Sequence, residues 1–152
     1  MIVGMDQLPT TEAAVTALRA LADEYAREIE VSHDIGADQT SRRTASGVGV
    51  TTDPDGSLPH EAHVEFGGRP RVRVRLYPED DALIEVENVE CPDVPRDEVP
   101  AFLRSVFEDR AYVKARRFPP GYFLVVPMPR DRTHKEFIPM LVLTPWLSER
   151  VR

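Results

Sequence analysis

The residues that could support catalysis or metal binding are few and lie far apart along the chain. Cys91, the single cysteine, could act as a nucleophile only as a thiolate, and the neighbouring Glu90 and Asp93 would raise the pKa of its thiol. His60 and His63 have the spacing of two metal ligands on one turn of a helix. We expect them in a strand instead, where they would point to opposite faces. The prediction is therefore an inert cysteine and no metal site.

Three short motifs resemble functional sequences but fit structural roles better. Ser32-His33-Asp34 has the residue types of a hydrolase triad, although triads are assembled in space from distant segments. The 53–56 turn lacks the glycine and glutamate positions of a calcium loop, and Gly47-x-Gly49 lacks the third glycine and the helix of a phosphate loop. An active site would have to gather His33, His60 or His134 with carboxylates. We predict that the protein is not an enzyme and uses no cofactor.

One stretch does combine residue types that bind ligands. Residues 112–123 interleave basic and aromatic side chains along an expected β-hairpin, with alternate residues on one strand face. Such a surface could stack bases while its cations hold phosphates, or it could bind an acidic protein. The candidate partner-binding residues are Tyr112, Lys114, Arg116, Arg117, Phe118, Tyr122 and Phe123.

The charge of the chain bears on which partner this hairpin would bind. The formal net charge is −7, which repels a polyanion at long range in low salt. Residues 78–109 hold 2 basic and 11 acidic side chains, whereas residues 110–152 hold 9 basic and 3 acidic ones. Salt bridges between neighbouring elements would explain part of this contrast. We therefore favour a protein partner or self-association over nucleic acid, which the net charge disfavours.

The first element that the sequence predicts is a helix over residues 10–30. Thr10 or Thr11 can cap it, and apolar side chains recur at helical spacing at Ala14, Leu18, Leu21, Tyr25 and Ile29. Residues 1–9 are then an N-terminal arm, and the polar residues 32–46 are a long loop. A length of 152 residues suits one domain over residues 10–152.

From residue 48 onward, alternating apolar and polar residues predict strands. We expect a short strand at 48–50 and further strands at about 61–66, 71–77 and 82–89. Keeping the apolar residues on one face pairs Val64 with Val72 across a three-residue loop. The same rule places Ala82, Ile84 and Val86 opposite Leu76, Val74 and Val72, with Arg71, Arg73 and Arg75 between acidic neighbours.

The second half of the chain continues with a crossover at 89–95 and a helix at about 97–109 capped by Asp97. Strands are expected at 111–118, 122–127 and 136–143, and Thr144 begins a short terminal helix. The last of these strands is apolar from residue 137 to residue 143, so it is buried on both faces or covered by a partner chain. The candidate dimer interface is Phe137, Met140, Val142 and Trp146.

The order α-β-β-β(-β)-α-β-β-β-α predicts an α+β domain, with an antiparallel sheet and helices packed on one face. This order is similar to that of the type III secretion chaperones. The resemblance implies a small, acidic, non-enzymatic homodimer that holds other proteins, although the 32–46 loop and the 137–143 strand depart from the family pattern. No apolar stretch is long enough to span a membrane and no signal pattern begins the chain, so we expect a cytoplasmic protein.

Two functions follow as hypotheses. The first is a non-catalytic, cytosolic protein-interaction or chaperone-like protein that acts as a homodimer. The second is a nucleic-acid-binding module that uses the hairpin at 112–123.

Overall fold

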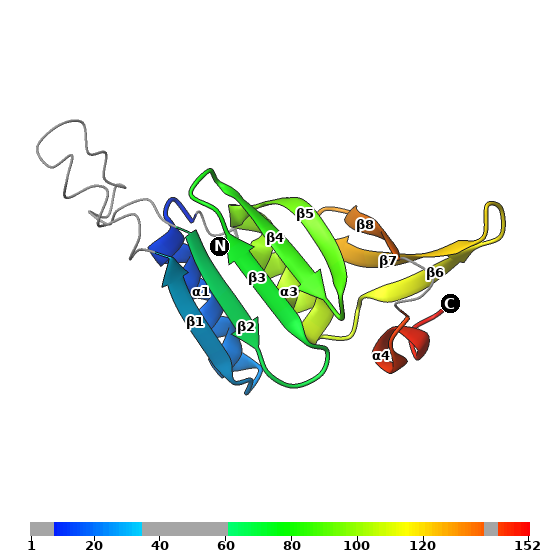
Figure 1. Cartoon of the computed structure of the whole chain (residues 1–152), viewed down its shortest axis with the longest axis horizontal. Coiled ribbons are helices and arrows are strands. Elements are labelled where there is room, and N and C mark those ends of the chain that lie inside the picture. The colour runs from blue at the N-terminus through cyan, green and yellow to red at the C-terminus, as the bar shows by residue number, and fades with distance from the viewer. Residues whose placement is uncertain (1–7, 35–60, 139–142) are drawn as a thin grey trace, which may run out of the picture.

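The structure is a computed structural model that describes residues 8–34, 61–138 and 143–152 (Figure 1). Its helices are α1 (Thr11–Glu24), a short 3-10 helix η1 (Arg96–Glu98), α3 (Val99–Phe107) and a short α4 (Pro145–Ser148). A five-stranded antiparallel sheet consists, in spatial order, of β1 (Ile29–Asp34), β2 (Glu61–Phe66), β3 (Val72–Leu76), β4 (Asp81–Val86) and β5 (Val89–Pro95). A three-stranded antiparallel sheet consists of β6 (Tyr112–Arg116), β7 (Gly121–Met128) and β8 (Arg132–Ile138).

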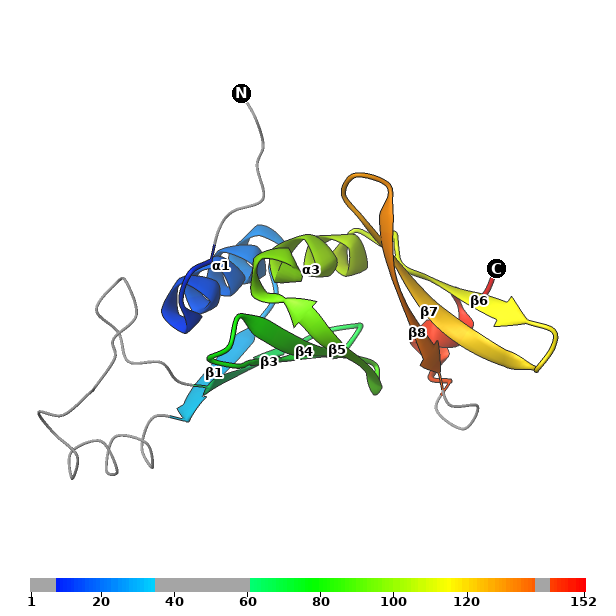
Figure 2. The same cartoon turned by 90° about the horizontal axis from the view of Figure 1, so that it is seen from above.

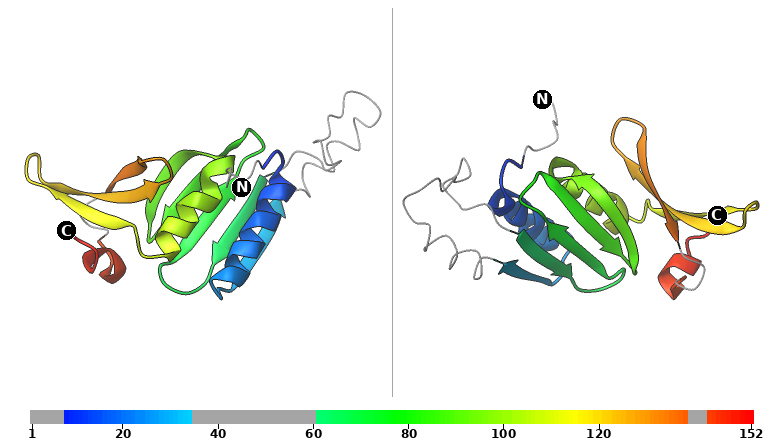
Figure 3. Two further views of the ribbon diagram at one scale, coloured as in Figure 1. Left: turned by 180° about the vertical axis from the view of Figure 1, so that it is seen from behind. Right: turned by 45° about the horizontal axis from the view of Figure 1, so that its top comes forward.

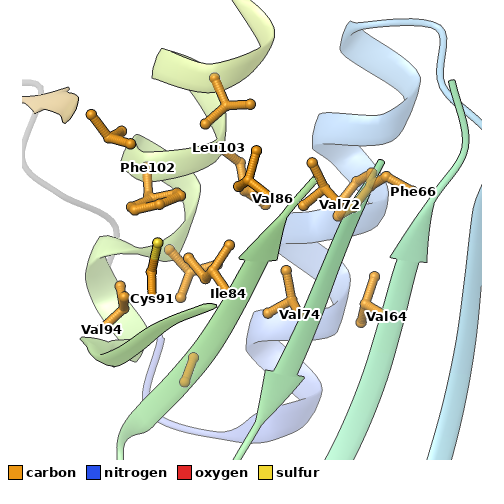
Figure 4. Close-up of a cluster of buried hydrophobic side chains, with 14 of the residues drawn as sticks. Val64, Phe66, Val72, Val74, Ile84, Val86, Cys91, Val94, Phe102 and Leu103 are labelled. Atoms are coloured by element: carbon orange, nitrogen blue, oxygen red, sulfur yellow. The ribbon is translucent and has the colours of Figure 1, made fainter. Parts of the chain in front are cut away.

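The predicted α+β class is confirmed, but the strands form two sheets in place of the single sheet expected. Both α1 and α3 lie on one face of the five-stranded sheet, and no described helix lies against the other face (Figures 2 and 3). This follows from the strand pattern, because every second residue of β2, β3 and β4 is buried. Ile84, Cys91 and Phe102 lie together in this layer (Figure 4).

One core holds the two sheets together. The buried cluster that begins on α1 continues through α3 to Val113, Leu124 and Ile138 of the second sheet, and then to Leu147 of α4. β7 packs against α3, and β8 lies beside β5. The three-stranded sheet is therefore anchored through one face, and its β6–β7 hairpin projects away from α1 and α3 (Figure 1).

The strand registers test the pairing rule directly. The predicted β3–β4 pairing is confirmed, with Val74 opposite Ile84 and Arg73 opposite Glu85. The predicted β2–β3 register is wrong by two residues, because Val64 lies opposite Val74 rather than Val72. The β2–β3 loop is accordingly longer than predicted and spans residues 67–71. A shift of two keeps the same side chains inward, so face assignments survive the error.

The predicted helix over residues 10–30 is too long. Thr10 caps α1 as predicted, with its hydroxyl oxygen accepting from the Ala13 N–H at 3.0 Å, but the helix ends at Glu24. Residues 29–34 form β1 instead, with Ile29 opposite Phe66 and Val31 opposite Val64. The predicted loop at 32–46 thus begins inside a strand. Its remainder and the strand predicted at 48–50 lie outside the described residues.

The segment predicted as a crossover, residues 89–95, is the strand β5. Its prolines are tolerated because β5 is the last strand of its sheet. The following helix was predicted to be capped by Asp97, but α3 begins at Val99 after a 3-10 turn. The Asp97 carboxylate accepts instead from the backbone N–H of Leu8, at 2.6 Å, and so fixes the chain that enters α1.

The C-terminal elements follow the prediction in part. The strand expected at 136–143 is β8, which spans Arg132–Ile138, and residues 139–142 lie outside the described part of the chain. The Thr144 hydroxyl accepts from the Leu147 N–H at 3.4 Å and caps α4, as predicted. After α4, Val151 pairs with Val113 in parallel, and the chain ends along the free edge of β6.

Candidate functional site

The three-stranded sheet has two faces of different character. Cross-strand register places Lys114 opposite Phe123, and Phe123 opposite Phe137. The alternate positions Val113 and Leu124 are buried in the core. Because side chains alternate along a strand, Lys114, Phe123 and Phe137 must lie on the face that points away from the core.

We call this outward surface the basic face. Six of its strand positions carry cations or aromatic rings, and no aspartate or glutamate occupies an outward position of β6, β7 or β8. Lys114, Arg116 and Lys135 are exposed. The basic face consists of Tyr112, Lys114, Arg116, Phe123, Lys135 and Phe137, together with Arg152 from the C-terminal segment.

Phe123 lies at the centre of this face, on the middle strand. The Arg116 Cζ atom lies 5.3 Å from the centroid of the Phe123 ring, and the Lys135 Nζ atom lies 4.4 Å from it. The Phe137 ring meets Phe123 edge-on, with 5.7 Å between centroids. Cations above an aromatic ring gain about 0.5–1 kcal/mol each at exposed sites, which holds the two like charges beside one another.

Arg152 joins the basic face through backbone pairing. The Val113 N–H donates to the Arg150 carbonyl, and the Arg152 N–H donates to the Val113 carbonyl, each at 2.9 Å. This pairing brings the Arg152 guanidinium to 4.6 Å from the Tyr112 ring centroid. Sequence reasoning missed Arg152, because nothing in the chain pattern shows that the C-terminal residues pair with β6.

The structure brings together only part of the predicted binding hairpin. Tyr112, Lys114 and Arg116 share the basic face, as expected from their alternation, and the β6–β7 register adds Phe123 to it. Tyr122 does not, because its side chain points to the opposite face and packs against the core.

The remaining two residues of the predicted set lie at the end of the hairpin rather than on the face. Arg117 and Phe118 are in the β6–β7 turn, where Phe118 is 91% exposed. The Arg116 Nε–H donates to the Pro119 carbonyl at 3.2 Å across the same turn. The hairpin tip therefore presents the exposed Phe118 side chain, which follows two arginines in the sequence.

The predicted dimer interface does not form one surface. Phe137 is 54% exposed and belongs to the basic face. Trp146 is only 4% exposed, and the Arg150 Cζ atom lies 3.9 Å from the centroid of its ring system. Trp146 is thus part of the core beneath α4 and cannot contact a partner in this arrangement. Met140 and Val142 lie outside the described residues.

The histidines considered for catalysis are spread across the fold. His33 on β1 has its Nδ1 atom 3.6 Å from Glu12, and His63 has its Nε2 atom 3.1 Å from Glu61. His134 belongs to β8 in the other sheet, where its ring meets Phe102 at 5.5 Å. His60, and the segments around Gly47 and Asp53, lie outside the described residues.

The remaining chemical candidate, Cys91, is fully buried in the core. Burial raises the pKa of its thiol far above the usual range, and the nearby Glu136 carboxylate adds to the effect. The side chain is therefore a thiol rather than a thiolate. Over the part of the chain that the structure describes, no group of three or more His, Cys, Asp and Glu side chains is arranged to hold a metal ion.

Comparison with known proteins found no matching family model, no matching curated protein and no matching solved structure. The similarity to type III secretion chaperones stays a prediction. None of the described helices has the length and apolar character needed to cross a membrane.

Proposed function

We propose that this protein is a non-catalytic interaction module of the cytoplasm that binds an acidic segment of another protein on the basic face. One observation carries the proposal. A sheet face with Lys114, Arg116 and Lys135 and no carboxylate points outward, while the reverse of the same sheet is fixed to the core. Such a face is held rigid before a partner arrives, so binding does not have to order it.

The residue types of the basic face suit a carboxylate-rich partner. Arg116 offers the planar donor set that pairs with carboxylates in two parallel hydrogen bonds, and the two lysines add point charges. Phe137, on the outer strand β8, adds exposed apolar area to the same face. Aromatic rings and arginine are the side chains that most often dominate binding energy in protein interfaces.

Nucleic acid is the competing partner, because aromatic rings on adjacent strands of an exposed sheet can stack bases. Two observations favour protein. The Phe123 ring is already contacted by Arg116 and Lys135, so it is not a free stacking platform. The chain as a whole carries a net charge of −7, which opposes the approach of a polyanion.

Fluorescence anisotropy with two labelled probes tests this choice. One probe is a peptide of alternating Glu and Leu, and the other is single-stranded oligothymidylate, both at the same ionic strength. We expect the peptide to bind more tightly, and we expect Lys114→Gln with Arg116→Gln to weaken its binding at least about tenfold.

A matched variant controls for the loss of two positive charges anywhere on the surface. Arg69→Gln with Arg130→Gln removes the same charge from two exposed loop residues outside the basic face. It should leave peptide affinity within about twofold of the parent. Tighter binding of oligothymidylate, binding of neither probe, or equal effects of the two variants would overturn the proposed function.

A further inference from the structure

The uncovered face of the five-stranded sheet has the opposite charge to the basic face. Cross-strand register aligns one residue from each strand in a row that crosses the whole sheet. We call this the acidic row, and in spatial order it consists of Glu30, Glu65, Arg73, Glu85 and Glu90.

The acidic row is neutralised only in part within the described chain. Arg73 forms ion pairs with Glu65 at 3.7 Å and with Glu85 at 3.9 Å, distances that are too long for hydrogen bonds, and one arginine stands against four glutamates. Glu30 and Glu90 have no ion-pair partner among the described residues. Each of them instead stands directly opposite another glutamate, Glu65 and Glu85 respectively. Like charges at opposed positions destabilise a sheet, so the row retains repulsion that a cationic partner would relieve.

The surface above the acidic row is open. A groove of about 790 Å³ runs over it, and its lining also includes two cations from outside the row, Arg19 and Arg75. Both long helices lie on the reverse of the sheet (Figure 2). A flat sheet surface of another molecule could therefore reach the carboxylates.

We propose that a second copy of this chain occupies the acidic row with its basic face. The inference rests on the proposed function, since it identifies one acidic partner of the basic face. The match is one of charge between two open sheet faces. Four glutamates of the row face four cations of the basic face, namely Lys114, Arg116, Lys135 and Arg152, and both surfaces are outward faces of antiparallel sheets.

One molecule cannot satisfy both surfaces itself. The two sheets share a single core, and each turns its inner face toward it, so the two outer faces look away from that core. The contact must therefore join different molecules. It also joins unlike surfaces, so each added copy leaves one basic face and one acidic row free for further association unless a ring closes.

Sedimentation velocity over a range of protein concentrations tests the inference. At about 0.05 M salt we expect species larger than the 17.2 kDa monomer, and at about 1 M salt we expect the monomer alone, because screening removes the attraction. Two reversal variants should each be monomeric at low salt. The first is Lys114→Glu with Arg116→Glu, and the second is Glu30→Lys with Glu90→Lys.

The decisive measurement mixes the two reversal variants. The first retains an intact acidic row and the second an intact basic face, so an equimolar mixture should associate although neither variant does so alone. The positions Glu30 and Glu90 suit this test, because a lysine there faces a glutamate and should not harm folding. Asp23→Lys with Glu79→Lys, two exposed sites off the sheet face, should associate like the parent.

A monomeric parent at low salt would overturn the inference, as would a mixture that stays monomeric or association that neither reversal changes. The peptide experiment separates this failure from failure of the proposed function. If the acidic peptide binds the basic face while the parent stays monomeric, the proposed function stands and the inference that a second copy is the partner fails. If the basic-face variant binds peptide like the parent, the proposed function is wrong as well.

Discussion

Phe137 of β8 occupies the space that a side chain at Gly121 of β7 would fill. A Cβ atom on Gly121 would lie 2.9 Å from the Phe137 Cε2 atom, closer than real Cβ contacts come. The glycine is buried beneath this ring. Its role is therefore to admit an aromatic side chain to the basic face, rather than to supply an unusual backbone angle.

Gly121→Ala should displace the Phe137 ring and disturb its contact with Phe123. We expect a loss of about 1 kcal/mol in the free energy of unfolding, measured by urea titration, because the half-exposed ring can move aside but loses its edge-on contact with Phe123. Acidic-peptide affinity should fall with it, since Phe137 is the exposed apolar residue of the basic face.

A double-mutant cycle isolates this contact from general effects of alanine at position 121. In the Phe137→Ala background the clash is absent, so Gly121→Ala should cost less than about 0.5 kcal/mol. If Gly121→Ala lowers the free energy of unfolding equally in the two backgrounds, the position of the Phe137 ring does not depend on a glycine at residue 121.

Tyr25 provides a prediction for alkaline pH. Burial first, and then a hydrogen bond from its hydroxyl to the Glu108 carboxylate, raise the pKa of Tyr25 from 10.0 to about 12. A pKa that is higher in the folded state gives stability that is complete below the unfolded pKa and is lost as pH rises through the folded value. We expect this contribution to disappear between about pH 10 and 12.

Urea titrations at several pH values from 9 to about 12 check this, with the parent compared with Tyr25→Phe. The phenylalanine variant lacks the titrating hydroxyl, so its stability should fall less steeply over that window than the parent's does. Parallel curves for the two proteins would contradict the role assigned to Tyr25.

The sequence was a good guide wherever the alternation of side chains decided the structure. It predicted the β3–β4 register and the shared face of Tyr112, Lys114 and Arg116, because side chains two residues apart on a strand lie on the same face. It did not predict the length of the β2–β3 loop. The Arg27 guanidinium donates to the carbonyls of Gly67, Arg69 and Pro70, and such a contact from a distant segment leaves no local pattern.

Other errors have equally specific causes. Ile29 fits a helical stripe with Tyr25 and a strand alternation with Val31, so periodicity could not locate the end of α1. The predicted strand began at residue 136 and therefore left out Lys135. A strand that begins at Arg132 and pairs with β7 places Lys135 on the same face as Phe137. The split into two sheets depends on which strands pair, and alternation within a strand says nothing about that.

Arg96 shows how a charged side chain can be structural in this fold. It is 3% exposed, and its guanidinium donates to the carbonyls of Leu8, Tyr77 and Pro78 at 3.0–3.3 Å. These carbonyls belong to the entry into α1 and to the β3–β4 turn. Arg96 therefore joins its own segment, at the start of η1, to two other backbone segments.

The Asp80 carboxylate also lies 3.2 Å from Arg96, but its side chain is 90% exposed, so water screens the pair. We expect Arg96→Met to lower the free energy of unfolding by about 3 kcal/mol, because buried carbonyls lose their donors. Asp80→Asn should cost less than about 1 kcal/mol, since asparagine tolerates the positive φ of this position and only a screened charge is lost. Urea titration of both variants decides between the two contacts: equal losses would mean that the ion pair, and not the backbone carbonyls, holds Arg96 in place.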